Sequence, residues 1–138
     1  MRRNNRGHRV AEQELDFLIE ELRRRHWTLY LWGPRGNPEH FAAVFRWPGN
    51  YVDVLLLRED GSATAYRTLY FDERNMFRPE IVAWQFHHAN AYWTFRAVYA
   101  LPDPGTPGVV LQPEVPIRRC LLPAGLPSPV VIRPLGLL

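Results

Sequence analysis

The densest group of chemically capable side chains lies between residues 84 and 93. Two imidazoles, two amides and several aromatic rings follow one another in Trp84-Gln85-Phe86-His87-His88-Ala89-Asn90-Ala91-Tyr92-Trp93. Aromatic rings can stack on a ligand, and an imidazole can transfer a proton or bind a metal near neutral pH. The candidate residues for binding a ligand or a partner are Trp84, His87, His88, Tyr92, Trp93 and Arg96.

A metal site in this group would need more ligands than it offers. Successive side chains of a strand point to opposite faces, so His87 and His88 cannot bind one ion without a bend, and His40 would have to join one of them. The chain also lacks a glycine-rich phosphate loop, a Gly-x-Ser-x-Gly elbow, a His-Glu-x-x-His motif and an EF-hand loop. We therefore expect neither a metal nor a cofactor.

Acid-base catalysis would require a carboxylate beside one of the histidines. Asp72, Glu73 and Glu80 flank the region, but closeness in sequence does not bring side chains together in space. The lone cysteine, Cys120, allows no internal disulfide, and we expect it to be inert because a nucleophilic cysteine needs a histidine beside it in space, which the sequence does not show. We expect a non-enzymatic protein, and keep a small enzyme or ligand-binding domain centred on His87 and His88 as an alternative.

The charge of the chain permits a nucleic-acid partner without favouring one. All 17 basic residues are Arg and the net charge is +3, which falls short of a concentrated basic stripe. A nucleic-acid-binding alternative would combine an Arg-rich N-terminus with aromatic rings exposed for stacking. Its residues would be Arg2, Arg3, Arg6 and Arg9, with Trp32, Tyr51 and Tyr70.

The elements that must position these residues begin with a helix over residues 10–25. Ala11, Leu15, Leu18, Ile19 and Leu22 recur at helical spacing, and acids precede the closing arginines, which complements the helix dipole. Period-two alternation then predicts strands over 27–32, 41–47, 51–58 and 62–71. The Asp60-Gly61 pair predicts an antiparallel hairpin between the last two of these strands, within a meander.

The next segments are less regular. The polar stretch 72–79 predicts a loop, and residues 81–86 predict a short fifth strand. Asn90 can cap a helix that ends before Pro102, although the aromatic residues there also suit a strand in a hairpin. We favour the helix.

The segment from 102 to 138 holds nine of the thirteen prolines, which exclude a regular helix or a central strand. It is nevertheless too apolar for disorder, so we expect it to lie extended on its own domain, on a second copy or on another protein. The expected organisation is a basic tail (1–9), a single α+β domain (10–101) and this proline-rich tail (102–138).

The fold class that these elements predict is α+β: an N-terminal helix, an antiparallel meander of four to five strands, a second helix and the extended tail, with the helices on one face of the sheet. No apolar run is long enough to cross a bilayer, so we expect a cytoplasmic protein with no membrane partner. Surplus apolar and aromatic residues favour an adaptor that binds a protein partner, itself included as a homodimer.

Overall fold

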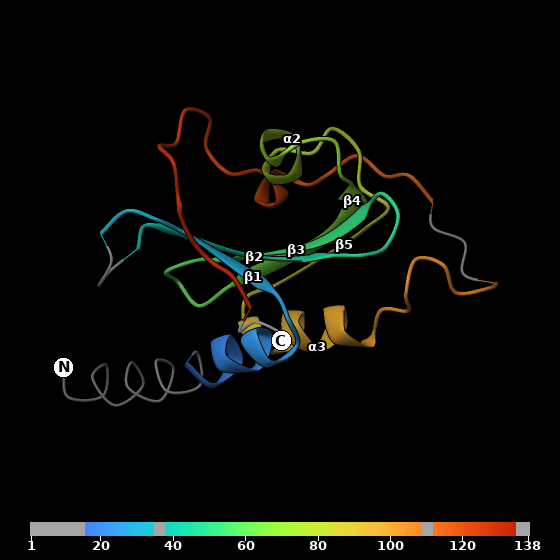
Figure 1. The fold of residues 1–138 in the computed structure, drawn as a ribbon, viewed down its shortest axis with the longest axis horizontal. Helices are drawn as coiled ribbons and strands as arrows, with labels where there is room; N and C mark the ends of the chain where they lie inside the picture. Colours follow the sequence, from blue (N-terminus) through green and yellow to red (C-terminus); the bar gives the residue numbers. More distant parts are fainter. Residues whose placement is uncertain (1–15, 35–37, 109–111, 135–138) are drawn as a thin grey trace.

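The computed structural model describes residues 16–34, 38–108 and 112–134, which form an α+β domain around a six-stranded antiparallel sheet (Figure 1). The strands lie in the order β5-β4-β3-β2-β1-β6, so the first five are sequential neighbours and the last joins the edge of β1. Their bounds are β1 Thr28–Trp32, β2 His40–Arg46, β3 Tyr51–Leu57, β4 Ala63–Leu69, β5 Trp84–His88 and β6 Val130–Ile132. The predicted antiparallel meander is confirmed.

The hairpin between β3 and β4 turns at Asp60-Gly61, as predicted. Gly61 has a φ of +85°, a backbone conformation that suits glycine, and the Asp60 carboxylate accepts hydrogen bonds from the backbone N–H and hydroxyl of Ser62. The turn sets a register in which Leu57 pairs with Ala63 and Tyr51 with Leu69. This register decides which face of the sheet each side chain of β4 lies on.

One face of the sheet is covered by two helices, the N-terminal helix over residues 16–24 and α3 (Ala91–Ala100) (Figure 1). The part of the predicted first helix from residue 10 to 15 lies outside the described residues. The predicted second helix is confirmed, and the side chain of Asn90 caps it by accepting a hydrogen bond from the N–H of Tyr92. The buried core on this face contains Leu18, Leu22, Trp27, Leu29, Phe41, Ala43, Leu55, Leu57, Ala63, Ala65, Ala91, Phe95 and Val98.

Small side chains decide where α3 lies. Ala63 and Ala65 of β4 leave room for the helix to approach the strand, and the buried Thr94 hydroxyl donates to the carbonyl of Ala63 at 2.8 Å. The backbone N–H of Ala91 donates to Gly61 in the hairpin turn. The first turn of α3 is thereby fixed against the end of β4.

The opposite face is covered by a short helix that the sequence did not predict. Residues 72–79 were expected to form a loop, but α2 (Glu73–Phe77) lies there, with Asp72 as its N-cap accepting from the N–H of Asn75 at 2.7 Å. The helix forms because Met76 and Phe77 are buried against the sheet, which outweighs the weak helical tendency of so short a segment. Expecting a loop there was wrong.

The fifth strand is also displaced from its predicted range. It runs over Trp84–His88 rather than residues 81–86, because Arg67 of β4 pairs with Trp84 and no later β4 residue has a partner on that side. Val82 forms an isolated bridge with Glu114 of the C-terminal segment instead. The strand therefore begins three residues later than the apolar pattern indicated.

The C-terminal segment adds to the second face and to the sheet. It contains a 3-10 helix, η1 (Arg118–Cys120), which places Cys120 and then Leu122 in a buried core with Tyr30, Trp32, Val54, Tyr66, Phe77 and Val82. It then forms β6 along β1. Pro129 and Pro134 flank β6, and proline cannot extend a strand ladder, so this edge of the sheet is short.

A buried ion pair lies on the face of the sheet that α3 and the N-terminal helix cover. The guanidinium of Arg67, with none of its surface exposed, donates from Nε and Nη2 to the two carboxylate oxygens of Asp53 at 2.6 and 2.9 Å. Its Nη1 donates to the carbonyl of Pro102, and the indole of Trp47 donates to Asp53. The charges are matched and hydrogen-bonded, which is the condition for burying them.

In the described part of the chain, no helix combines the length and the apolarity needed to cross a bilayer.

Candidate functional site

The His87-His88 region is divided by the sheet, as strand alternation requires. Trp84, Phe86 and His88 lie on the face that α3 covers, and Gln85 and His87 lie on the opposite face. Of the six candidate residues, five share the α3 side: Trp84 and His88 from β5, and Tyr92, Trp93 and Arg96 from α3. His87 does not join them.

The two histidines have separate and ordinary partners. The Nδ1 of His87 is 2.8 Å from the hydroxyl of Thr64, and the Nδ1 of His88 accepts from the N–H of Asn90 at 2.9 Å. His40 lies on β2, three strands away from β5. Within the described ranges, no three His, Cys, Asp or Glu side chains gather as a metal site requires.

The electrostatic setting of His87 disfavours its charged form. Partial burial lowers the pKa of His87 from its ordinary 6.5, and the charges of Arg119 and Arg58 lower it further. Asp60 acts in the opposite direction, but its carboxylate is hydrogen-bonded to Ser62. The carboxylates that would support acid-base catalysis also lie elsewhere: Asp72 caps α2, and the described residues that line the two hollows around Glu80 include no histidine.

Cys120 is held on the same face as His87. Its thiol lies 3.5 Å from the side-chain oxygen of Gln85, and that oxygen also accepts from the N–H of Ile117. Burial raises the pKa of the Cys120 thiol to about 11, so little thiolate forms near neutral pH. The residue fills space in the second core.

Among the residues of the nucleic-acid alternative, the structure describes Trp32, Tyr51 and Tyr70. Trp32 was expected to be exposed but is buried in the second core, because α2 covers that face. Tyr70 lies under the guanidinium of Arg46, 4.0 Å from the ring centroid. Arg2, Arg3, Arg6 and Arg9 lie outside the described residues.

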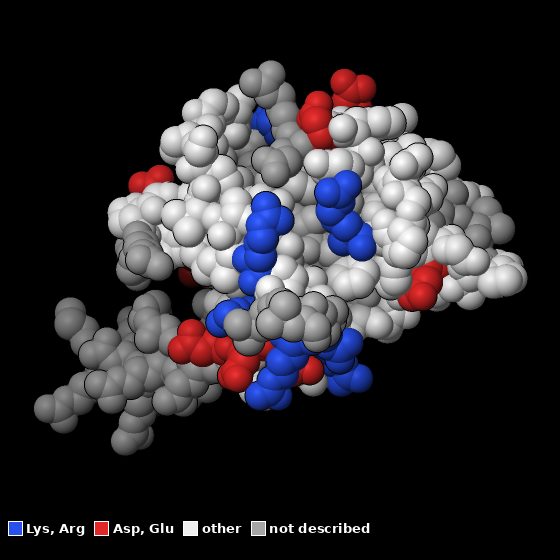
Figure 2. All heavy atoms as spheres, viewed as in Figure 1, with Lys and Arg blue, Asp and Glu red and all other residues white. Residues whose placement is uncertain are grey.

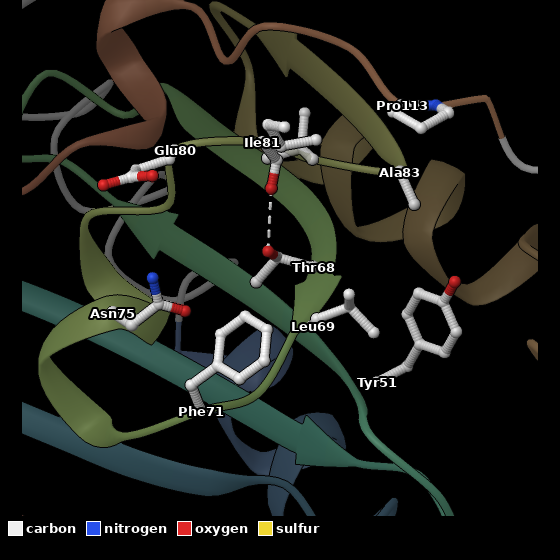
Figure 3. A pocket seen from close by; sticks show the side chains of 10 residues that line it. Tyr51, Thr68, Leu69, Phe71, Asn75, Glu80, Ile81, Ala83 and Pro113 are labelled. Atoms are coloured by element: carbon white, nitrogen blue, oxygen red, sulfur yellow. Dashed lines mark hydrogen bonds between the residues drawn. The ribbon is translucent and has the colours of Figure 1, made fainter.

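The most distinctive surface is an apolar groove of about 360 Å³ between the end of β4 and the chain that precedes β5. Three large apolar side chains that line it are exposed: Phe71 by 74%, Ile81 by 58% and Leu69 by 40%. Figure 3 shows Leu69 between the rings of Phe71 and Tyr51, with Ile81, Ala83 and Pro113 across the opening. Large apolar groups gathered in this way on a surface are typical of a binding site.

The groove exists because β5 is shorter than β4. The ladder ends where Arg67 pairs with Trp84, so Thr68 and Leu69 extend past the neighbouring strand. Two hydrogen bonds join the chain to β4 at this point: the N–H of Ala83 donates to the carbonyl of Arg67, and the Thr68 hydroxyl donates to the carbonyl of Ile81. The chain bends away beyond these bonds and leaves the hollow.

The C-terminal segment forms part of the groove wall. Val82 and Glu114 exchange two backbone hydrogen bonds, which places Ala83 beside Pro113 and Ile81 beside the exposed Val115. The side chain of Gln85 holds the same segment through the carbonyl of Val115 and the N–H of Ile117. The apolar surface therefore continues from the groove onto residues 113–115.

Glu80 is the one charged residue among the ten that line the groove. It lies with Asn75 at the end away from Tyr51 (Figure 3), and neither side chain makes a hydrogen bond or an ion pair to another described residue. A wider hollow of about 880 Å³ continues beyond these two side chains, between α2 and residues 122–129. The groove thus offers apolar contacts along its length and, at one end, the carboxylate of Glu80, which can pair with a positive charge.

Charge elsewhere on the visible face is mixed. Figure 2 shows acidic and basic side chains interleaved at the N-terminal helix and no continuous basic stripe. The ion pairs Glu20–Arg24 and Glu21–Arg25 account for part of this mixture. This face therefore resembles an ordinary solvated surface.

The groove residues Leu69, Phe71, Ile81 and Pro113 were not recognised from the sequence. Apolar residues at positions 69, 71 and 81 bracket the polar insertion 72–80, which is the only signal that could have indicated them. Whether such residues are buried or exposed depends on where β5 starts, and that is set by pairing.

The fold and the site define an α+β domain that carries an apolar groove at the end of an antiparallel sheet. Comparison with models of protein families, with curated proteins and with solved structures finds no match for the chain.

Proposed function

We propose that this protein is an interaction module whose groove binds an apolar segment of a partner protein. The observation that carries the proposal is the gathering of Phe71, Ile81 and Leu69, three exposed large apolar side chains, around one cavity. Full burial of such a side chain is worth about 1.5 to 3 kcal/mol. A partner that covers all three gains enough to offset part of the cost of association.

The charge at the groove defines the partner further. Glu80 is without an ion pair among the described residues, and the other nine lining residues are uncharged. A Lys or Arg next to the apolar residues of the bound segment would satisfy it. The proposed ligand is therefore a short segment with two or more large apolar residues and one basic residue.

The proline-rich segment contributes to the groove. The sequence left its own domain, a second copy or another protein as the surface on which residues 102–138 lie; Cys120 and Leu122 are buried in this domain and Pro113 lines the groove. We propose that the segment completes the binding surface and is not itself the part that docks on a partner. Self-association stays a separate proposal, and sedimentation of the purified chain tests it.

Selection from a random-peptide library on the immobilised protein tests the binding proposal. We expect enriched peptides to carry apolar residues beside Lys or Arg, and substituting Phe71→Ser with Ile81→Ser to weaken their binding by about tenfold or more. In the Glu80→Arg variant, the charged residue of the enriched peptides should change from Lys or Arg to Asp or Glu. Phe17→Ser is the matched control, because Phe17 is 63% exposed on the N-terminal helix and is not among the residues that line this groove.

Two results would overturn the proposal: no enrichment of any peptide family, or enriched peptides whose binding the groove and control substitutions weaken equally. An unchanged preference in Glu80→Arg would remove the assigned role of the carboxylate.

A further inference from the structure

Four rings form a continuous row on the α3 side of the sheet, away from the groove. Trp84, Phe86 and His88 alternate along β5, and successive rings are parallel to within 6° and 8°, with centroids 6.3 and 6.5 Å apart. The ring of Trp93, in the first turn of α3, comes next in the row, with its centroid 6.3 Å from that of His88. The row therefore runs from the edge strand onto the helix.

The row becomes exposed at its helical end. Trp84 and Phe86 are half-buried, His88 is exposed, and Trp93 exposes 49% of its surface. The exposed guanidinium of Arg96 lies 5.8 Å from the centroid of Tyr92 and 5.9 Å from that of Trp93. A cation and two accessible π faces thus lie within one patch, formed by His88, Tyr92, Trp93 and Arg96.

The polar groups of this patch are donors apart from the Tyr92 hydroxyl, which accepts a hydrogen bond from Arg96 at 3.3 Å. Because the Nδ1 of His88 accepts from Asn90, its Nε2 carries the proton and can donate. The Trp93 indole and the Arg96 guanidinium also donate, and residues 91–100 include no acid. The patch is complementary to a planar group attached to an anion.

We propose that the patch binds single-stranded nucleic acid, with a base stacked on Trp93 beside His88 and a phosphate on Arg96. Aromatic stacking next to an arginine is a common means of binding single strands, because every base has a π face and every nucleotide a charge. A duplex keeps its bases stacked inside and offers none to a surface ring. None of the ten residues that line the groove belongs to this patch, and α2, which contributes Asn75 to the groove, lies across the sheet from α3 (Figure 1), so the two sites are separate.

Fluorescence anisotropy with labelled oligo-dT and oligo-rU of about 15 nucleotides, a length that spans one such site, tests the proposal. Trp93→Ala should weaken binding by about fivefold or more, since stacking one base contributes about that factor or more. Trp93→Phe keeps a ring and should retain most of the affinity. Arg96→Ala should weaken binding and reduce the salt dependence by about 0.7 in log-log slope, the share of one phosphate on a single strand.

Arg24→Ala is the matched control for charge. Arg24 is exposed on the neighbouring helix and pairs only with Glu20, so this substitution removes the same charge from the same side of the molecule. We expect it to change affinity by less than about twofold, in line with a general electrostatic contribution. Circular dichroism of each variant verifies that it is folded.

Failure to bind either oligonucleotide at low salt would overturn the proposal, as would equal losses in Arg24→Ala and Arg96→Ala or full binding by Trp93→Ala. Tighter binding to a duplex or to heparin than to the single strands would show an attraction to charge alone and would also overturn it. A preference between oligo-dT and oligo-rU identifies which single strand the patch favours. The groove variant Phe71→Ser should leave this binding intact, which keeps this test separate from that of the proposed peptide binding.

Discussion

At the scale of single residues, side chains that look like surface groups in the sequence are built into the interior. Arg67 lies fully buried on β4, and it is held there by Asp53 on β3, fourteen positions earlier. The register of the hairpin brings the two opposite each other. A charged residue in an alternating strand would ordinarily be assigned to solvent, so the sequence gives no sign of this pair.

Replacing Asp53 should expose how much the domain depends on the pair. Asp53→Asn leaves the charge of Arg67 buried and unpaired, and we expect a loss of about 3 to 5 kcal/mol in the free energy of unfolding, measured by urea denaturation. Glu20→Gln is the control, because it breaks an exposed ion pair worth under about 1 kcal/mol. Similar small losses in both variants would contradict the assigned role of Asp53.

Cys120 should be unreactive while the protein is folded. Its thiol is buried and its pKa is raised to about 11, so a thiol reagent at pH 8 should modify it slowly in buffer and quickly in urea. Mass spectrometry of the labelled chain over time measures both rates. Rapid labelling of the native protein would show that η1 and the segment around it open readily.

His87 should make stability depend on pH. The pKa of His87 in the folded protein is below the ordinary 6.5, so the unfolded chain binds the proton more tightly than the folded protein does. Protonation of His87 therefore favours unfolding as the pH falls. The contribution of His87 is complete above about pH 6.5 and decreases as the pH falls below that value. Comparison of urea unfolding at several pH values between wild type and His87→Gln isolates this slope, and an identical slope in both would contradict it.

At the scale of elements, the regular strands were predictable and the short helix and the pairing ends were not. Alternating apolar residues and the Asp60-Gly61 turn specify β1 to β4, because both signals are local. Helix α2 spans too few residues to show a helical period, and only its burial against the sheet explains it. The start of β5 depends on which β4 residue it pairs with, and this pairing is set by the tertiary structure and not by the local sequence.

The contribution of the C-terminal segment to the stability of the domain can be measured by truncation. A chain that ends at Leu101 loses Cys120 and Leu122 from the second core and β6 from the sheet. We expect this truncation to abolish the cooperative thermal transition, because removing even one buried leucine side chain costs about 2 to 5 kcal/mol. A cooperative melt at an unchanged midpoint would show that residues 102–138 are dispensable.

This expectation also decides how partners should be mapped. A truncated chain that loses its partner would have lost its fold as well, so the loss would not locate an interface. Point substitutions at exposed positions such as Phe71 and Ile81 remove contacts without removing core, and they are the appropriate variants.

At the scale of the whole molecule, the domain carries two surfaces of different chemistry. The groove lies at the end of β4 next to α2 and is apolar with one carboxylate, whereas the patch at the start of α3 is aromatic with one guanidinium. Four of the six candidate residues chosen from sequence, His88, Tyr92, Trp93 and Arg96, form the second surface, because a cluster of rings is visible in a sequence. The first surface is assembled from residues 51 to 113, and only the fold brings them together.

Photo-crosslinking in the cells that make the protein tests the central claim most directly. A photoreactive phenylalanine analogue at position 71 lies in the groove, and the same analogue at position 17 lies on the exposed face of the N-terminal helix. We predict a discrete crosslinked protein from position 71 that is absent from position 17 and is lost when Ile81→Ser is added. Crosslinks that are absent from position 71, or are the same from both positions, would contradict a binding role for the groove.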